Sequence, residues 1–355
     1  MDRHDTHPAT AILPDEMAEI DADTWLVPGG EAALALGIAA SHSDAVILWQ
    51  PVDVRHRDAV SVPPPNLRIE APGIDSGPVD AVALVVPPDR DLARRWLVVA
   101  KASLAPGGRL CMAGANAEGI RSIVGDARTL FGPPSREGYR SKQRFADFEA
   151  RPAPGEEPTW VREPGIAPGT WREFTLDFRG RTVTLVTQAG VFAGDRIDIG
   201  TRLLLDRLPE LVTGNVLDVG CGAGVIGIAA SLLGAGRVDL VDASLLAVQA
   251  AAENLRRLEL PGCRAFASDV YDALGDTRYD LIVSNPPFHR GKAVDLSVAD
   301  RLIAGAPAHL AAGGALVLVA NAFLAYGKRM ARVFRDVETI AATRQYHIIR
   351  ASAPR

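Results

Sequence analysis

Residues 279–289, Tyr-Asp-Leu-Ile-Val-Ser-Asn-Pro-Pro-Phe-His, combine a short apolar run with a double proline. The apolar residues at 281–283 have the length and character of one buried strand. Pro286 and Pro287 have no N–H group and a fixed φ, so the strand has to end there in a rigid, extended chain. We therefore expect the side-chain carbonyl of Asn285 and the backbone carbonyls beside it to point off the strand end, without a ladder partner.

The groups at this strand end indicate a binding site for a planar group that carries an NH2. The side-chain carbonyl of Asn285 and a backbone carbonyl beside it would accept its two hydrogens, and the ring of Phe288 would stack on its face. An ordinary β-turn is the alternative, because Asn-Pro is a common turn dipeptide. Residues 279–289 alone leave both interpretations open, so the choice depends on the sequence upstream.

A glycine-rich segment at residues 218–224 reads Asp-Val-Gly-Cys-Gly-Ala-Gly and connects an expected strand at 216–219 to an expected helix. The glycines allow a tight turn and let a ligand approach the backbone. The next expected strand ends at Asp242, whose carboxylate can accept hydrogen bonds from both hydroxyls of a ribose. Open parallel sheets bind ligands at the carboxyl ends of their strands, so Asp218, Asp242 and Asn285 are expected at one edge.

The sequence of this loop is compatible with two different cofactors. Residues 222–227 fit the dinucleotide pattern G-x-G-x-x-G, and Asp242 follows at the spacing of a ribose-binding acid, which would indicate a nicotinamide enzyme. S-adenosylmethionine is the other candidate, because it gives Asp218, before the glycines, a role that a dehydrogenase lacks. A dehydrogenase also has no use for Asn-Pro-Pro-Phe at 285–288. Glycines that only allow strand–helix packing are a third possibility, but two carboxylates at consecutive strand ends argue against it.

The segment that precedes this loop is also patterned. Residues 174–187 predict a β-hairpin with a two-residue Arg-Gly turn. Asp198 follows, and then an expected helix at 202–211 that Thr201 can cap. Strands and helices alternate from there to the C-terminus, which predicts an α/β fold with a parallel sheet.

The first half of the chain repeats the order of these signals. Residues 85–88, Val-Val-Pro-Pro, precede a helical stretch and a Gly-Gly turn, as residues 284–287, Ser-Asn-Pro-Pro, do in the second half. A duplicated domain explains this order, and a chance resemblance of two α/β sheets is the alternative. Val86 stands in the first copy where Asn285 stands in the second, and no glycine-rich loop matches. The first copy is therefore expected to lack the chemistry.

The length of 355 residues exceeds one ordinary domain and predicts two. We expect a polar lead-in at 1–24, a first α/β domain without chemistry at 25–131, a linker rich in Pro and Gly at 132–170, and a catalytic α/β domain at 171–355. Basic residues cluster between positions 136 and 144 of the linker and could touch phosphates. A solvated loop with scattered charge explains them more simply.

Charge and cysteine content limit the possible partners. With a formal net charge of −5, contact with nucleic acid would need a local basic patch. Cys111, Cys221 and Cys263 are far apart and show neither disulfide nor metal-ligand spacing, so no metal is expected and a reducing cytoplasm fits best. The N-terminus lacks the apolar core of a signal peptide, and no apolar run reaches the roughly 18 residues that a membrane span needs.

The chain resembles class I methyltransferases of the small-domain family, in particular those that modify guanine N2 in bacterial ribosomal RNA. The resemblance covers residues about 174–351 and is carried by Gly-Val-Phe at 190–192 with Asp-Ile-Gly at 198–200, by the segment 216–224, by Ser-Asn-Pro-Pro-Phe-His at 284–289 with Gly291, and by Val-Ala-Asn-Ala-Phe-Leu at 319–324. Members of this family have two tandem methyltransferase-like domains. The resemblance thus implies two Rossmann-like domains, a degenerate N-terminal one and a C-terminal one with a seven-stranded cofactor-binding sheet.

The resemblance also implies two sets of site residues. The set around S-adenosylmethionine would be Asp198, Gly200, Asp218, Gly220, Cys221, Gly222, Gly224, Asp242, Ala243, Asp269, Val270 and Asn285. The catalytic set would be Asn285, Pro286, Pro287 and Phe288. In the first set Asp242 would bind the ribose and Asp269 would lie beside the adenine, while in the second Asn285 would hold the target amine.

The implied reaction is transfer of a methyl group from S-adenosylmethionine to the exocyclic N2 amine of a guanine in ribosomal RNA, in the cytoplasm. Methyltransferases of adenine and of protein glutamine share Asn-Pro-Pro-aromatic motifs, so N-methylation of those targets is the alternative. A non-catalytic RNA-binding or assembly factor is disfavoured, because Asp218, Asp242 and Asn285 are all present. The sequence sets no expectation for the modified nucleotide, the ribosomal subunit or the oligomeric state.

Overall fold

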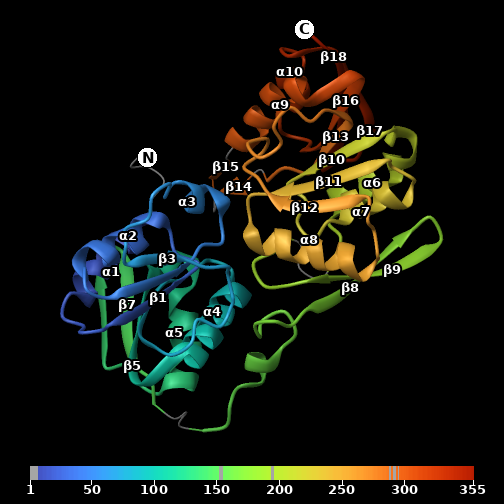
Figure 1. Cartoon of the computed structure of the whole chain (residues 1–355). Coiled ribbons are helices and arrows are strands. Elements are labelled where there is room, and N and C mark those ends of the chain that lie inside the picture. The colour runs from blue at the N-terminus through green and yellow to red at the C-terminus, as the bar shows by residue number, and fades with distance from the viewer. Residues whose placement is uncertain (1–6, 152–154, 193–195, 288, 291–292, 295) are drawn as a thin grey trace. The chain divides into compact units, whose positions relative to one another are not determined.

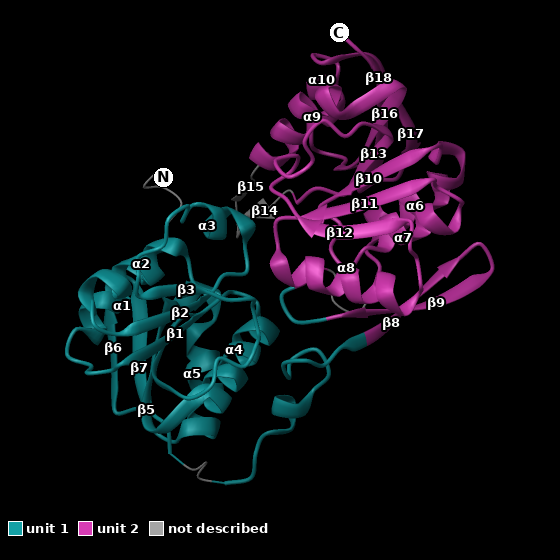
Figure 2. Cartoon of the chain, viewed as in Figure 1, with its two compact units in different colours: residues 1–172, 188–190 teal, residues 173–187, 191–355 magenta. Residues whose placement is uncertain are grey.

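The computed structural model describes residues 7–151, 155–192, 196–287, 289–290, 293–294 and 296–355. The chain forms two compact units, unit 1 from residues 1–172 with 188–190 and unit 2 from residues 173–187 with 191–355 (Figure 2). Each unit contains a seven-stranded sheet with helices packed against it (Figure 1). The predicted α/β class with two tandem Rossmann-like domains is confirmed.

The elements of unit 1 begin with helix α1. Its α-helices are α1 (Pro8–Met17), α2 (Ala32–Ser41), α3 (Val54–Asp58), α4 (Arg90–Ser103) and α5 (Ile120–Phe131), and its 3-10 helices are η1 (Asn116–Glu118) and η2 (Thr159–Arg162). Its strands are β1 (Thr24–Pro28), β2 (Val46–Gln50), β3 (Leu67–Ile69), β4 (Val79–Val85), β5 (Leu104–Ala115), β6 (Arg136–Arg140) and β7 (Gln143–Glu149). The sheet order is β3-β2-β1-β4-β5-β7-β6, with antiparallel pairing only where β7 takes part.

The elements of unit 2 follow in the same alternation. Its strands are β8 (Arg172–Phe178), β9 (Arg181–Thr187), β10 (Asn215–Val219), β11 (Arg237–Asp242), β12 (Cys263–Ala267), β13 (Tyr279–Ser284), β14 (His289–Arg290), β15 (Ala293–Val294), β16 (Leu310–Asn321), β17 (Phe334–Ala342) and β18 (Tyr346–Pro354). Its helices are α6 (Ile199–Leu211), α7 (Val225–Leu232), α8 (Leu245–Arg257), α9 (Ser297–His309) and α10 (Tyr326–Met330). The main sheet has the order β12-β11-β10-β13-β16-β18-β17, and β8 pairs with β9 in a separate hairpin.

The two main sheets have the same topology, strand for strand. Their details match as well, because Asp80 accepts a hydrogen bond from the backbone N of Thr24 at 3.0 Å in unit 1, and Asp280 accepts one from the backbone N of Asn215 at 2.7 Å in unit 2. The register also shifts at the same place in both, after Val79 and after Tyr279. The repeated order of signals in the sequence is therefore a repeat of the fold.

The strand register corrects one detail of this repeat. Ala81 and Leu281 are the first paired residues after the shift in their strands, which makes Val85 the counterpart of Asn285. Alignment of the two double prolines in the sequence predicts Val86 at this position instead. Unit 1 has one extra residue between the strand and the prolines. The counterpart of Asn285 is a valine whether the strands or the prolines are aligned.

The expected lead-in at 1–24 contains helix α1, which packs into the core of unit 1. Ala9, Leu13 and Met17 are at most 1% exposed and belong to a cluster that includes Trp25 and Trp49. The sequence hides this helix because Pro14 lies inside it and its 10 residues show no clear separation of an apolar face from a polar one.

The expected linker at 132–170 contains the last two strands of the first sheet. Strand β6 is an edge strand whose residues are largely exposed, so it lacks the apolar alternation that would reveal it. The turn between β6 and β7 uses Ser141 and Lys142 at φ of 50° and 64°, without a glycine to mark it. Farther along, Ile166 is fully buried. Only part of this range thus has the character of a linker.

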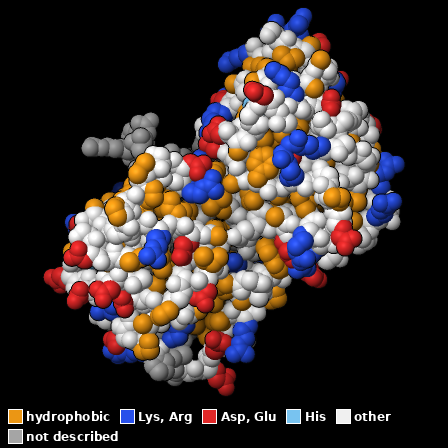
Figure 3. Space-filling model, in the orientation of Figure 1, with side chains coloured by type: hydrophobic (Ala, Val, Ile, Leu, Met, Phe, Trp, Pro, Cys, Tyr) orange, Lys and Arg blue, Asp and Glu red, His pale blue; other side chains and the backbone are white. Residues whose placement is uncertain are grey.

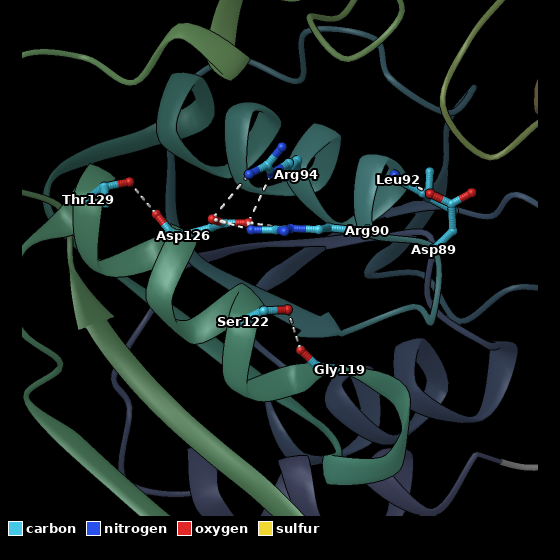
Figure 4. A network of polar contacts seen from close by, with 8 residues as sticks. All are labelled: Asp89, Arg90, Leu92, Arg94, Gly119, Ser122, Asp126 and Thr129. Atoms are coloured by element: carbon cyan, nitrogen blue, oxygen red, sulfur yellow. Dashed lines mark hydrogen bonds and ion pairs between the residues drawn. The ribbon is translucent and has the colours of Figure 1, made fainter. Parts of the chain in front are cut away.

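Asp126 joins helices α4 and α5 of unit 1. Its carboxylate accepts hydrogen bonds from Arg90 at 3.1 Å and from Arg94 at 2.9 Å, one helix facing the other (Figure 4). Burial raises the pKa of Asp126, but the hydrogen bonds from Arg94 and Arg90 outweigh it and the net shift is downward. The carboxylate stays ionised and the two helices remain tied at neutral pH.

The N-terminus of α6 differs from expectation. The sequence predicts Thr201 as the cap, but the helix begins at Ile199 and Asp198 is its N-cap. Asp198 accepts hydrogen bonds from the backbone N of Gly200 and of Thr201, because a carboxylate one residue before the helix reaches both free N–H groups. The predicted hairpin at 174–187 is confirmed, with Arg179 and its neighbouring glycine both at positive φ in the turn.

The described part of the chain contains no helix that is long and apolar enough to cross a membrane. Figure 3 shows Lys and Arg side chains dispersed among acidic ones on the face in view.

Candidate active site

Three neighbouring strands of unit 2 end at the same edge of the sheet. Val219, the last residue of β10, pairs with Val241 of β11 on one side and with Ser284 of β13 on the other. Asp242 and Asn285 are the next residues along the two flanking strands. Figure 1 shows β10, β11 and β13 side by side, and their register brings the glycine-rich loop, Asp242 and the Asn-Pro-Pro segment to one edge, as the sequence predicts.

The glycines of the loop have two different tasks. Gly220 and Gly222 have φ of 70° and 55°, and a Cβ on either would meet no atom within 4 Å, so the loop presents bare backbone on that side. Gly224 has φ of 88°, and a Cβ there would lie 2.9 Å from Cδ2 of Leu240. The first two therefore leave room for a ligand, and the third lets helix α7 approach the sheet. Burial raises the pKa of the Cys221 thiol in the same loop, which keeps it protonated.

Asp242 shapes this loop through its carboxylate. It accepts hydrogen bonds from the backbone N of Gly222 at 2.9 Å and from the backbone N of Ser244 at 2.8 Å. Asp242 and Ala243 are both partly exposed. A carboxylate oxygen can accept more than one hydrogen bond, so Asp242 can hold the loop and bind ligand hydroxyls together.

Asp218 is fully buried behind the loop. Its Oδ2 accepts a hydrogen bond from the backbone N of Gly227 at 2.8 Å, and its Oδ1 has no hydrogen-bond partner among the described residues. Burial raises the pKa of Asp218 to about 7; the Gly227 hydrogen bond opposes this shift and the charge of Asp242 adds to it. Asp218 thus stabilises the first turn of α7 by this hydrogen bond to Gly227.

Replacing Asp218 by asparagine should change how stability depends on pH. The folded pKa of about 7 exceeds the unfolded value of about 4, so the wild type loses stability as pH rises through that window. Asp218→Asn keeps an acceptor for Gly227 but cannot ionise. From pH 5 to pH 8 its free energy of unfolding should therefore improve relative to wild type by about 3 kcal/mol. Denaturant titrations at both pH values measure this difference.

The control for that experiment is Asp239→Asn. Asp239 is also fully buried, but hydrogen bonds from Arg264 and Arg237 outweigh its burial and lower its pKa. Its contribution is lost only as pH falls through the acidic range, so Asp239→Asn should be destabilised equally at pH 5 and pH 8. If the difference in free energy of unfolding between Asp218→Asn and the wild type is the same at pH 5 and at pH 8, the raised pKa of the buried Asp218 carboxyl is contradicted.

Asn285 lies at the end of β13 with its side-chain amide held in place. Its Nδ2 donates to Oδ2 of Asp198 at 2.8 Å and to Oγ1 of Thr201 at 2.9 Å. Its Oδ1 receives no hydrogen bond from the described residues. Pro286 is buried and Pro287 is exposed, which fixes the chain beyond Asn285.

The remaining predicted site residues lie farther along the edge or outside the described chain. Asp269 follows β12, where its carboxylate pairs with Arg301 of α9 at 2.8 Å, and the neighbouring Val270 is 5% exposed with φ of 56°. Phe288 lies outside the described residues. Gly200 packs at the start of α6, where a Cβ would lie 2.7 Å from Cγ1 of Val319.

Asn254 is a site residue that the sequence interpretation missed. It is fully buried on α8, accepts a hydrogen bond from the backbone N of Val186 at 2.7 Å, and donates to the backbone oxygens of Val186 and Ala223. It therefore connects the end of β9 to the glycine-rich loop. The signal was its position at helical spacing from Ala247 and Ala250, a polar residue on an apolar face.

This fold and this site define the class of S-adenosylmethionine-dependent methyltransferases. Residues 182–350 match the family model described as Methyltransferase small domain. Within this class, "Ribosomal RNA small subunit methyltransferase C" of Klebsiella pneumoniae is 33% identical over 349 residues, which cover 97% of this chain and 96% of the relative. The chain belongs to the ribosomal RNA small subunit methyltransferase C family.

A second relative and a solved structure agree with this family assignment. The enzyme of the same name from Chromohalobacter salexigens is 34% identical over 281 residues, 78% of this chain and 79% of the relative. A T. thermophilus 16S rRNA N2 methyltransferase, solved in complex with AdoMet and guanosine, superposes with a TM-score of 0.82 at 28% identity, covering 99% of this chain and 93% of that one. The described residues contain no group of three or more His, Cys, Asp or Glu side chains placed to hold a metal ion.

Proposed function

We propose that unit 2 transfers a methyl group from S-adenosylmethionine to the exocyclic N2 amine of a guanine in the RNA of the small ribosomal subunit. The observation that carries this proposal is the Asn285 amide at the end of β13, one strand from the glycine-rich loop, whose Nδ2 is bound by Asp198 and Thr201 while its Oδ1 receives no hydrogen bond from the described residues. Similarity over nearly the whole chain to small-subunit enzymes selects RNA over the alternative protein or adenine targets.

The residues present fit the cofactor. The bare backbone at Gly220 and Gly222 leaves room for a ligand, and Asp242 offers carboxylate oxygens beside it. We assign the methionine part to the loop from Asp218 to Gly224, the ribose to Asp242 with Ala243, and the adenine to Asp269 with Val270. When bound there, S-adenosylmethionine supplies an activated methyl group on a sulfonium.

The protein contributes orientation and electrostatics at the target nitrogen. The lone pair of guanine N2 is delocalised into the ring, so the amine is a weak nucleophile. Asn285 Oδ1 and the Pro286 carbonyl would accept its two hydrogens, which favours a pyramidal nitrogen with its lone pair directed at the methyl group. Because N2 lies on the pairing edge, the guanine has to be unpaired or flipped before it enters.

Unit 1 is proposed to lack this chemistry. By strand register Val27 and Val85 occupy the positions of Asp218 and Asn285. The end of β2 is covered by the chain's own loop, because the Gln50 side chain binds the backbone oxygen of Ile74 at 3.1 Å and the backbone N of Gly73 at 3.0 Å. A valine cannot accept a hydrogen bond, and a filled strand end leaves little room for a cofactor.

The test is transfer of labelled methyl from S-adenosylmethionine to cytoplasmic rRNA and protein from cells that lack this gene, followed by nucleoside and amino-acid analysis. Label in N2-methylguanosine of small-subunit RNA is the expected result. Label in N6-methyladenosine or methylglutamine would replace the proposed target. Cofactor binding by calorimetry without any transfer would favour a non-catalytic RNA-binding factor.

Replacing Phe323 should weaken the use of RNA as substrate without changing cofactor binding. Unit 2 exposes three large apolar side chains among its described residues, and Phe323, 64% exposed, comes two residues after the end of β16, the neighbour of β13. Base stacking on an aromatic ring contributes about 1–3 kcal/mol. Phe323→Ala should therefore lower kcat/KM for RNA about 10-fold or more and leave cofactor affinity unchanged. Phe323→Trp is the control that retains a ring, and equal kcat/KM for all three proteins would refute the stacking role.

A further inference from the structure

The N-terminus of α6 and Asn285 share one hydrogen-bond network in unit 2. Asp198 receives four hydrogen bonds from the described residues, two on each carboxylate oxygen. Oδ1 accepts from the backbone N of Gly200 at 2.8 Å and of Thr201 at 3.3 Å, and these two contacts cap the helix. Oδ2 accepts from the Thr201 hydroxyl at 2.5 Å and from Nδ2 of Asn285 at 2.8 Å.

This network permits only one orientation of the Asn285 amide. A side-chain amide has a donor end and an acceptor end of nearly equal size, and packing alone discriminates poorly between them. A carboxylate has no proton to donate, so Oδ2 of Asp198 requires the NH2 group. Thr201 has already donated its proton to Asp198, so its oxygen also presents a lone pair to Nδ2. Both partners therefore turn Oδ1 away from α6.

We propose that Asp198 and Thr201 are positioning residues that lock Asn285 with its acceptor facing the target amine. This inference rests on the proposed function, because the orientation matters only where Oδ1 binds an N–H group of the substrate. It also gives Asp198 a different task from lining the cofactor pocket. If the Asn285 amide flipped, its NH2 group would face the NH2 group of guanine, and two hydrogen-bond donors would repel each other.

The two carboxylate oxygens allow capping and positioning to be separated. Asparagine caps helices as well as aspartate does. In Asp198→Asn the side-chain oxygen can keep the bonds to Gly200 and Thr201, while an NH2 replaces Oδ2. That NH2 faces the NH2 of Asn285, and the Asn285 amide relieves the conflict by flipping.

Asp198→Asn should thus lower kcat about 100-fold, a loss of the size seen when one preorganised polar group is removed. The KM for S-adenosylmethionine and the midpoint of thermal unfolding should stay near wild type. The matched control is Asp89→Asn in unit 1, where Asp89 caps α4 through the backbone N of Leu92 at 2.9 Å (Figure 4). It makes the same chemical change at a helix cap and should leave kcat unchanged.

A second substitution should restore the function. In the double variant Asp198→Asn/Asn285→Asp the new NH2 at position 198 donates to one oxygen of the new carboxylate at position 285 and leaves the other oxygen to accept from the target. The double variant should exceed both single variants at least 10-fold in kcat. In Asn285→Asp alone, the carboxylate at position 285 faces that of Asp198 and the two repel each other. A role for Asp198 in folding alone predicts no such rescue.

Thr201 provides an independent test if Asp198→Asn unfolds. Thr201→Val removes the acceptor but keeps the shape, and should lower kcat about 10-fold, while Thr201→Ser should retain activity. Wild-type kcat in Asp198→Asn or in Thr201→Val, or a double variant no better than the singles, would overturn the positioning role. A wild-type protein that makes no N2-methylguanosine would instead refute the proposed function.

Discussion

Asn285→Ala is expected to lower the rate of methyl transfer to RNA by about 100- to 1000-fold, with cofactor affinity unchanged. The substitution removes the acceptor at the end of β13, and losing one preorganised contact to the reacting group costs about 100- to 1000-fold. It also frees Asp198 and Thr201 from their shared donor. Single-turnover transfer to small-subunit RNA measures the rate, and calorimetry with S-adenosylmethionine measures the affinity.

Asn116→Ala is a suitable control for that experiment. Asn116 lies in unit 1, where its Oδ1 makes one long contact of 3.4 Å with Arg144. Its replacement should leave the transfer rate at the wild-type level. If Asn285→Ala methylates RNA at the wild-type rate, the acceptor has been assigned to the wrong residue.

Asp242→Ala is expected to weaken binding of S-adenosylmethionine by at least about 100-fold. The variant loses the hydrogen bonds to the backbone N of Gly222 and of Ser244, so the glycine-rich loop loses its support, and it loses the proposed acceptor for the ribose. Hydrogen bonds to charged groups contribute about 1.5–3 kcal/mol each, and 1.4 kcal/mol is a factor of ten in affinity. Calorimetric titration gives the dissociation constant directly.

Asp58→Ala removes an exposed carboxylate of unit 1 and controls for the change in net charge. Its dissociation constant should equal that of wild type. An Asp242→Ala variant with the same affinity as Asp58→Ala would show that the end of β11 does not hold the cofactor.

The sequence predicts the ligand-binding edge of unit 2 well, because local rules place it. Apolar runs define β10, β11 and β13, and the glycines and prolines end two of them at fixed positions. Parallel pairing then brings the residues after these strands together. The same rules detect the repeat in unit 1, although the extra residue before its prolines shifts the apparent counterpart of Asn285 by one position.

The sequence does not predict the contacts that depend on tertiary packing. The link between Asp198 and Asn285 exists because α6 lies close to β16, and only a glycine at position 200 permits that approach to Val319. Asn254 is similar, since its side chain forms hydrogen bonds with Val186 of β9 and Ala223 of the glycine-rich loop, which are far from it in the sequence. Helix α1 and strand β6 escape detection because their apolar patterns are short or absent.

The most direct test of the central claim is the N2-methylguanosine content of small-subunit ribosomal RNA from cells that carry either the wild-type gene or Asn285→Ala. Mass spectrometry of the digested RNA counts the modified nucleosides. A guanine that carries an N2-methyl group in the wild type and lacks it in the variant is the predicted result, with the protein present at equal levels. The same N2-methylguanosine content in both strains would contradict transfer at the end of β13.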